Sequence, residues 1–319
     1  MVIVLHCYRN DDPFALIGGS GHIAMPVFFF LSGLLVAQSL DNSSSKHNFL
    51  WKRALRLYPA ACFVILLSAC VIGPLTTTLP LGTYFSHPLF FQYLCACFLV
   101  REYLCLPGVF EHSVLGPLVN VPLWSLGLEL KLYVALALSA FLPKKSRIPL
   151  TAIAILILFI IGTFFYSPVE RRLNDIFYTN FVLYPFTQYT VYFLIGNLCY
   201  YFRKHITIRN YWLPVALVAW WPGLHSPFPD LAGFILIPAL VLFLSASQTK
   251  WIHTLTPKPD LSYGLYVWAF PIEQLITNYL YPGNLTIRFL LVILFTIPVA
   301  FLSWNMVEKP ALRLKGRIK

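Results

Sequence analysis

The stretch FFFLSGLLVAQSLDNSSSKHNFLWKRALRLYP, residues 28–59, decides the fold class of this chain. An apolar run is followed by a short polar and basic turn, and the turn leads directly into a second apolar run. This pattern predicts two membrane helices joined by a turn. Arg53 and Arg56 open the second helix three residues apart, so we expect them to share one helical face near a membrane boundary.

The two arginines have two interpretations. Two guanidinium groups on one face can each bind phosphate oxygens in a bidentate way, which suits a ligand that carries several phosphates. Basic residues at the cytoplasmic end of a membrane helix are also ordinary topology signals that extend to the lipid headgroups. The local sequence leaves both interpretations open.

The composition indicates a membrane protein rather than a soluble domain. Of the 319 residues, 58% are hydrophobic and 11% are charged, and the mean hydropathy is +0.72. The net charge of +11 lies in short clusters between apolar runs, which favours contact with an anionic membrane leaflet over nucleic acid. The seven cysteines lack paired CxxC spacing, so neither a disulfide framework nor a metal site is expected.

Apolar runs of spanning or nearly spanning length recur along the chain. They lie at about 23–40, 57–75, 122–142, 149–166, 183–202, 211–224, 231–247, 260–281 and 286–306. We assign a further apolar stretch, 84–101, as re-entrant or interfacial, because only then do the main basic loops fall on one side of the membrane. The expected fold is an all-α polytopic bundle of about ten transmembrane helices with both termini cytoplasmic, and a single membrane domain fills 1–319 without a fused soluble domain.

The first of these helices is short. Five apolar residues precede His6, which corresponds to about 8 Å of helix against a hydrocarbon layer of about 30 Å. Either the natural start lies upstream of Met1, or the first helix has been shortened.

His6 is a candidate general base near the side opposite the arginines. A histidine can accept a proton from a hydroxyl group at neutral pH, and Asp11 or Asp12 could orient its ring. A hydrogen-bonded interfacial histidine without a catalytic role is the competing interpretation.

Two carboxylates are further candidates. Glu129 lies inside an apolar helix, where a carboxylate is costly and usually faces a cavity or a partner. Glu308 lies at the membrane exit of the last helix, just before Pro310. A structural ion pair with Arg53 or Arg56 is the competing interpretation for Glu129, and a structural contact with the basic loop between the second and third helices is the competing interpretation for Glu308.

Six short motifs together resemble the membrane-bound acyltransferase-3 family of integral-membrane O-acyltransferases. They are VLH at 4–6, FFFLSGLLV at 28–36, RALRLYP at 53–59, WSLGLELKLY at 124–133, LSYGLYVWAFPI at 261–272 and MVEKPALRL at 306–314. Each motif is degenerate alone, but their order along nearly the whole chain is specific. The sequence is most similar to the branch that O-acetylates lipopolysaccharide O-antigen or related surface polysaccharides.

The resemblance implies a division of labour between these residues. Arg53 and Arg56 match the family motif associated with the donor, acetyl-CoA, and His6 matches the catalytic histidine; in our mechanistic hypothesis Glu129 lines or orders the cavity. The motifs add Ser32, Trp124, Ser125, Tyr133, Ser262, Tyr263, Tyr266 and Glu308 as further site candidates. The implied reaction transfers an acetyl group from a cytoplasmic acyl-CoA to a sugar hydroxyl of a lipid-linked saccharide or surface glycan, in a multi-pass protein of the bacterial inner membrane, with no metal.

Two departures and two alternatives accompany this expectation. The family's basic residue eleven positions before the histidine would fall before Met1, and Ala269 stands where many relatives have a second histidine. A secondary transporter would also show about ten helices with buried charges, although no internal repeat supports it. Another acyl group, such as succinyl, remains open within the enzyme class.

Overall fold

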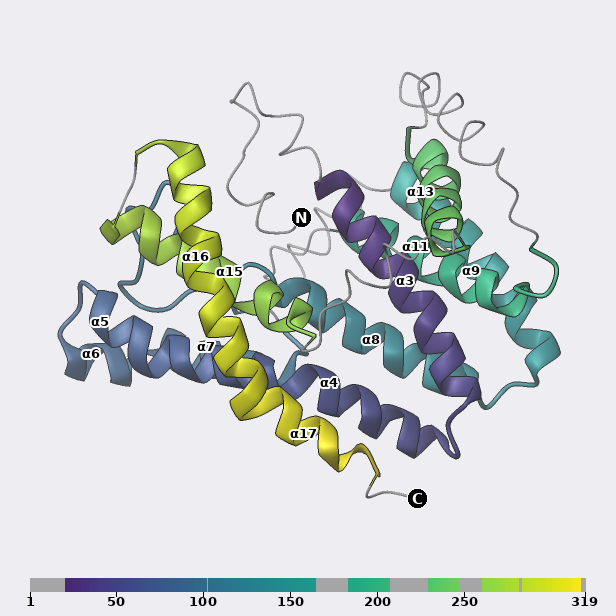
Figure 1. Cartoon of the computed structure of the whole chain (residues 1–319), viewed down its shortest axis with the longest axis horizontal. Coiled ribbons are helices and arrows are strands. Elements are labelled where there is room, and N and C mark those ends of the chain that lie inside the picture. The colour runs from purple at the N-terminus through teal and green to yellow at the C-terminus, as the bar shows by residue number, and fades with distance from the viewer. Residues whose placement is uncertain are drawn as a thin grey trace. The chain divides into compact units, whose positions relative to one another are not determined.

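The structure is a computed structural model that describes residues 21–101, 103–164, 183–206, 229–246, 260–280 and 283–316 (Figure 1). Within these ranges every regular element is helical, and the β contacts amount to one isolated bridge between Thr77 and Val109. The prediction of an all-α chain is therefore confirmed for the described residues. They form two compact units that alternate along the sequence.

Unit 1 comprises the described residues within 47–131 and 256–319. Its helices are α4 (Lys46–Leu67), η1 (Ser68–Ile72), α5 (Gly73–Thr76), α6 (Leu81–Ser86), α7 (Pro88–Cys95), η2 (Ala96–Phe98), the first half of α8 (Leu123–Ser139), α15 (Ser262–Leu275), η3 (Ile276–Leu280), α16 (Leu285–Ser303), η4 (Trp304–Glu308), α17 (Lys309–Arg313) and η5 (Leu314–Gly316). The segments η1, η3 and η4 are π-helical turns that continue the helix before them.

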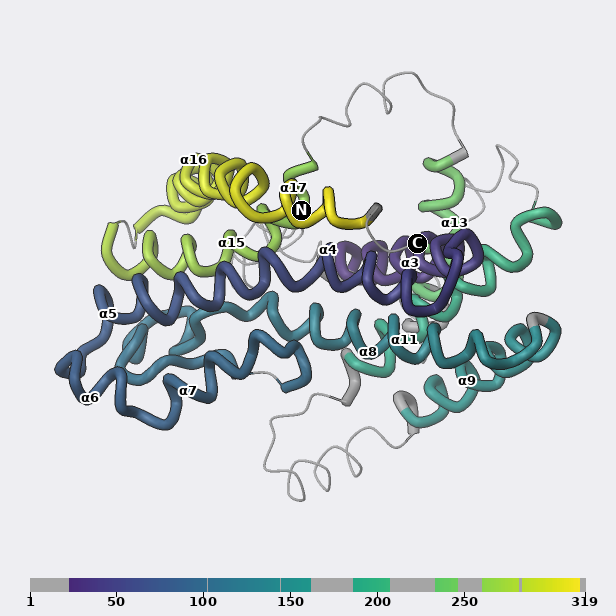
Figure 2. The backbone as a smooth tube through the Cα atoms, turned by 90° about the horizontal axis from the view of Figure 1, so that it is seen from below, coloured from purple at the N-terminus to yellow at the C-terminus, as the bar shows by residue number. Residues whose placement is uncertain are grey.

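The stretch 84–101 lies back along the second half of α4 (Figures 1 and 2). The Tyr84 hydroxyl donates to the carbonyl of Ala69 at 2.7 Å, and the Tyr58 hydroxyl donates to the carbonyl of Phe98 at 3.1 Å. His87 separates α6 from α7, so this stretch contains no helix long enough to cross a membrane.

Helices α15 and α16 pack closely side by side in unit 1 (Figure 2). A Cβ atom on Gly264 would lie 3.1 Å from the Cβ atom of Ala300, so the glycine allows the two helices to approach. The hydroxyl of the neighbouring Tyr263 donates to the carbonyl of Leu57 at 2.6 Å. The N-terminal end of α15 is thereby fixed against the basic segment of α4.

The opposite end of α15 is held by an amide. The fully buried Gln274 donates through Nε2 to the carbonyls of Gly116 and Leu118, at 2.9 and 2.7 Å. Its Oε1 accepts a hydrogen bond from Ser113 at 2.7 Å. Polar side chains therefore anchor the connection between η2 and α8 to one end of α15, while Tyr263 anchors the other end.

Unit 2 comprises the described residues within 22–46 and 132–255. Its helices are α3 (Gly21–Asp41), the second half of α8, α9 (Lys144–Phe164), α11 (Leu183–Tyr201) and α13 (Pro229–Ala246). Helices α3 and α11 cross through Gly33 and Gly196: a Cβ atom on Gly33 would lie 2.8 Å from the carbonyl carbon of Phe193. Backbone therefore packs against backbone, as is typical of membrane helices with small residues at their contacts.

Three helices in the described part of the chain are long and apolar enough to cross a membrane. They span Ile23–Asp41, Lys46–Thr76 and Leu285–Arg313. The described helices α8, α9, α11, α13 and α15 fall on further predicted spans, whereas the predicted first helix and the span 211–224 lie outside the described residues. The count of about ten spans and the orientation of the termini remain predictions.

Candidate active site

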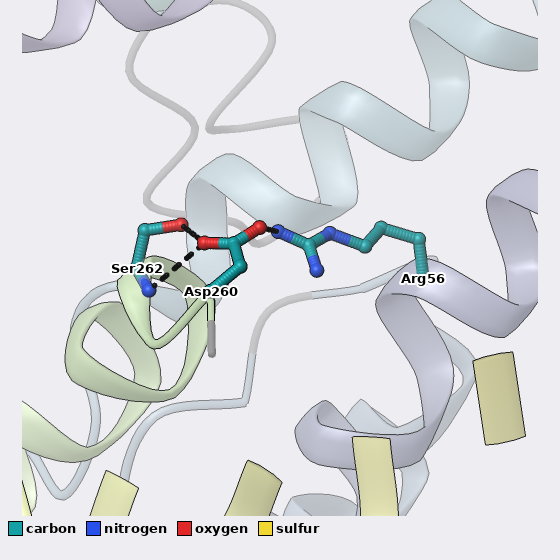
Figure 3. A network of polar contacts seen from close by, with 3 residues as sticks. All are labelled: Arg56, Asp260 and Ser262. Atoms are coloured by element: carbon teal, nitrogen blue, oxygen red, sulfur yellow. Dashed lines mark hydrogen bonds and ion pairs between the residues drawn. The ribbon is translucent and has the colours of Figure 1, made fainter. Parts of the chain in front are cut away.

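The basic end of α4 carries the best-defined polar cluster of unit 1 (Figure 3). The Nη2 atom of Arg56 donates to Oδ2 of Asp260 at 2.8 Å. The other carboxylate oxygen, Oδ1, accepts hydrogen bonds from the hydroxyl and the backbone N–H of Ser262, at 2.6 and 3.2 Å. Each oxygen of Asp260 therefore has its own partner, and the carboxylate holds a single orientation between α4 and α15.

Asp260 is ionised at neutral pH. Partial burial acts to raise the pKa of its carboxyl group, but the hydrogen bonds from Ser262 and the positive charge of Arg56 outweigh this effect. The net result is a pKa below the ordinary aspartate value. Arg56 therefore faces a full negative charge.

Further cations surround Arg56 in unit 1. Arg53 lies one turn earlier on α4, with its guanidinium 6.0 Å from the centre of the Phe49 ring. Lys315, in η5, lies within the field of the α4 cations: burial lowers the pKa of Lys315, and the charges of Arg56, Arg53 and Lys52 lower it further. Cations from α4 and from the C-terminal segment thus lie within one electrostatic field. For Arg53 and Arg56 themselves, the spacing of three residues predicted that they share a helical face.

The tyrosines and serines of the predicted site link α15 to α4 and α8. The ring of Tyr263 lies 5.6 Å from the Arg56 guanidinium. The hydroxyl of Tyr266 is hydrogen-bonded to that of Ser125, and both hydroxyl oxygens lie within hydrogen-bonding distance of the carbonyl oxygen of Pro122, at 3.2 and 3.0 Å respectively. Trp124, the neighbour of Ser125 on α8, is half-buried.

Three carboxylates are buried in unit 1. Glu129 on α8 is 4% exposed, Glu308 at the end of η4 is 3% exposed, and Glu273 on α15 is 1% exposed. Glu308 accepts a hydrogen bond from Ser303 at 3.3 Å. Buried carboxylates are retained only where partners or a function compensate for their desolvation, so Glu129 and Glu308 remain candidates for the site and Glu273 joins them.

The remaining predicted residues lie outside the described part of unit 1. Ser32 on α3 and Tyr133 on α8 lie in unit 2, where their hydroxyl oxygens are 3.4 Å apart. His6, Asp11 and Asp12 lie outside the described residues. Their roles therefore stay predictions.

Two members of the cluster were missed from the sequence. Asp260 is separated from Arg56 by 204 positions, and no local pattern links them. Lys315 stands among several basic residues of the tail, which indicated topology rather than a site. A carboxylate directly before the motif LSYGLYVWAFPI was the one available signal for Asp260.

Metal chemistry has no candidate centre in the described part of the chain. There, no group of three or more His, Cys, Asp and Glu side chains could hold an ion. The described cysteines, six in number, are all free thiols.

Comparison with known families decides the class of this protein. The model of the acyltransferase-3 family, described as an acyltransferase domain, matches residues 1–305. The chain belongs to the acyltransferase-3 family. The match includes Arg53, Arg56, Asp260 and Glu129, whereas Lys315 lies beyond the matched residues.

Known relatives of this acyltransferase align over nearly its full length. An O-acetyl transferase of Shigella phage Sf6 is 26% identical over 323 residues, covering 97% of this chain and 91% of the relative. Nodulation protein 10 of Rhizobium leguminosarum bv. viciae is 25% identical over 320 residues, and the alignment covers 91% of this chain and 82% of the relative. The O-acetyltransferase OatA of Staphylococcus aureus (strain NCTC 8325 / PS 47) is 26% identical over 93% of this chain, which spans 53% of OatA.

No solved structure matches this acyltransferase significantly. The helical architecture and the family together indicate a membrane-bound enzyme that transfers an acyl group. The O-acetyltransferases among its relatives agree with the acetyl group as the one transferred.

Proposed function

We propose that this enzyme transfers an acetyl group from cytoplasmic acetyl-CoA to a sugar hydroxyl of a lipid-linked or surface glycan, such as lipopolysaccharide O-antigen. The setting is the bacterial inner membrane, with the protein crossing it several times. The O-acetyltransferases among the relatives support O-acetylation, and the basic cluster at the end of α4 supports a donor that carries phosphates.

The observation that carries the proposal is the convergence of cations on Arg56. Arg53 and Arg56 come from α4 and Lys315 comes from the C-terminal segment, yet the charges of both arginines reach Lys315 and, together with its burial, lower the pKa of its ammonium group. Coenzyme A carries three phosphoryl groups, and guanidinium groups bind such oxygens in a bidentate way. A cluster that served only as a topology signal would not need cations from two distant parts of the chain.

In the proposed reaction, His6 accepts the proton of the sugar hydroxyl, and the sugar oxygen attacks the thioester carbonyl carbon. A carbon–oxygen bond forms, the carbon–sulfur bond breaks, and the leaving sulfur takes up a proton to give free CoA. A direct transfer is simpler than a covalent acyl-enzyme, because no serine or cysteine stands out in the sequence as an activated nucleophile. The proton on His6 returns to the leaving thiolate or to solvent.

The buried carboxylate of Glu129 has a proposed supporting role. It lies in the WSLGLELKLY motif on α8, four residues after Ser125, which is bonded to Tyr266 of α15. Residues four apart on a helix lie on one face, so Glu129 would line the same interior as the Ser125–Tyr266 pair. We propose that it orders the cavity through which the acetyl group passes.

The test is acetyl transfer from radiolabelled acetyl-CoA to surface glycan in membranes that contain the full chain. Parallel samples carry His6→Ala and, as a matched control, His205→Ala, which changes an exposed histidine after α11. Transfer that the parent and His205→Ala catalyse and His6→Ala does not would support the proposal. Transfer by His6→Ala at the parent rate would refute the base assignment, and transfer only from succinyl-CoA would refute the acetyl assignment.

A further inference from the structure

Arg56 is held at one edge of its guanidinium group (Figure 3). Among the described residues it makes one hydrogen bond, from Nη2 to Asp260 at 2.8 Å, and its guanidinium lies 5.6 Å from the centre of the Tyr263 ring. A guanidinium group has five N–H donors, so most of those of Arg56 remain for another acceptor. With 26% of its side chain exposed, Arg56 is accessible to an anionic ligand.

Asp260 is also held by a residue other than Arg56. Ser262 donates twice to Oδ1, which leaves Oδ2 directed at the arginine. One residue further along, the Tyr263 hydroxyl bonds the carbonyl of Leu57, the residue next to Arg56. The start of α15 therefore meets α4 at two adjacent residues, and the position of Asp260 relative to Arg56 is set by both contacts.

The ion pair is poorly suited to a purely stabilising role. Asp260 is 55% exposed, and ion pairs with such solvent access add little to the stability of a protein. A negative charge next to a phosphate site also weakens anion binding. Its presence there therefore requires another purpose. Lys52, Arg53 and Lys315 act in the same field and offset the negative charge of Asp260, and the carboxyl group of Glu308 also lies within the field of Arg56.

We propose that Asp260 is a positioning residue of the donor site: its carboxylate, held by Ser262, fixes the Nη2 edge of Arg56 so that the remaining donors face a phosphate group of the acyl-CoA. The inference rests on the proposed function, because it assigns how that same site orients its ligand. Asp260 does not touch the donor itself. Its effect passes entirely through Arg56.

The experiment uses the full chain in membranes and tests the binding of the two halves of the donor separately. Adenosine 3′,5′-bisphosphate represents the phosphate-bearing half of CoA, and pantetheine represents the half without that nucleotide. Asp260→Asn should raise the KM for acetyl-CoA and weaken inhibition by the bisphosphate by about five- to ten-fold, the size of one charge-assisted contact. Inhibition by pantetheine and kcat should stay within about two-fold of the parent values.

Three further variants sharpen the test. Asp260→Glu keeps the charge and should recover part of the bisphosphate affinity, whereas Ser262→Ala loosens the carboxylate and should cause a smaller loss than Asp260→Asn. Asp41→Asn is the matched control, because it makes the same change at a carboxylate of unit 2 that accepts a hydrogen bond from the Tyr200 hydroxyl at 3.3 Å.

Several results would overturn the inference. Tighter bisphosphate inhibition in Asp260→Asn would mean that the carboxylate competes with the donor, and equal changes for bisphosphate and pantetheine would mean a structural role. If the parent chain uses acetyl-CoA and Asp260→Asn shows the same KM and the same inhibition as the parent, Asp260 is not part of the site, and the proposed function is unaffected. A parent chain that neither uses acetyl-CoA nor binds the bisphosphate would instead refute the proposed function.

Discussion

Unit 1 and unit 2 are both apolar helical assemblies, but one helix pair in each unit meets through a different kind of contact. In unit 2, α3 and α11 cross at Gly33 and Gly196, where backbone lies against backbone. In unit 1, α4 and α15 are joined by the Arg56–Asp260 ion pair and by the hydrogen bond from Tyr263 to Leu57.

The glycine contact belongs to the scaffold of the protein, whereas the charged contacts belong to the proposed site. Close glycine contacts tolerate no added atoms, so they fix the distance between helices and contribute no functional group. Ion pairs and hydroxyl contacts of partly exposed residues contribute little stability but place charges accurately. We therefore expect changes in the glycine contacts of unit 2 to reduce the amount of folded protein, and changes in the charged cluster of unit 1 to reduce donor binding.

The largest effect is expected from Gly33→Val in unit 2. Its Cβ atom would meet the carbonyl oxygen and carbon of Phe193, which are backbone atoms and cannot rotate away. We expect a loss of about 3 kcal/mol in the free energy of unfolding. The measurements are the amount of full-length chain in the membrane fraction and its thermal midpoint in detergent.

The matched control for Gly33→Val is Gly82→Ala on α6, where an added Cβ atom meets no other atom within 4 Å. It should accumulate like the parent chain. Normal accumulation of Gly33→Val would contradict the close approach of α3 and α11.

The next largest effect is expected from Arg56→Lys in unit 1. Lysine keeps the positive charge but loses the planar fork that binds carboxylate and phosphate together. The KM for acetyl-CoA should rise about ten-fold while the amount of protein stays unchanged. Arg203→Lys, at the end of α11 in unit 2, is the control, and an equal KM change in both variants would argue against a specific donor contact.

A smaller effect is expected from Lys315→Gln. A flexible ammonium group contributes to the site as a point charge, so the KM for acetyl-CoA should rise about three-fold at low salt. The effect should disappear at high ionic strength, because screening weakens contacts between partly exposed charges. Lys309→Gln, at the exposed start of α17, should leave the KM unchanged, and a salt-independent effect of Lys315→Gln would contradict an electrostatic role.

The smallest effect is expected from Tyr263→Phe. The ring next to Arg56 is retained, but the hydrogen bond to the Leu57 carbonyl is lost. This should lower the free energy of unfolding by about 1 kcal/mol and change the KM by no more than about two-fold. Complete loss of acetyl transfer, with normal accumulation, would instead place the Tyr263 hydroxyl in the reaction.

The sequence predicted those parts of the fold that depend on local hydropathy and helical spacing. Apolar runs identified most described helices to within a few residues, because the length and polarity of a membrane helix are properties of one segment. The shared face of Arg53 and Arg56 follows from their spacing of three. Family motifs, which depend on order rather than on contacts, correctly identified the acyltransferase class.

The sequence could not predict contacts between distant segments. Asp260 meets Arg56 only because α15 packs against α4, and nothing near either residue encodes that pairing. The role of Gly33 was hidden for the same reason: a glycine in an apolar run marks a close contact only once its neighbour, Phe193, is known. Pairing between helices is a tertiary property, and propensity or periodicity does not contain it.

The central claim is that the basic cluster of unit 1 binds the phosphates of the acyl-CoA donor. Its most direct test is equilibrium binding of radiolabelled CoA to the purified full chain, compared between the parent and the Arg53→Ala/Arg56→Ala variant, with pantetheine as the phosphate-poor reference. The account predicts that the variant loses on the order of 100-fold in CoA affinity, the sum of two charge-assisted contacts, while its pantetheine affinity is unchanged. Equal CoA affinity in the two proteins would contradict it.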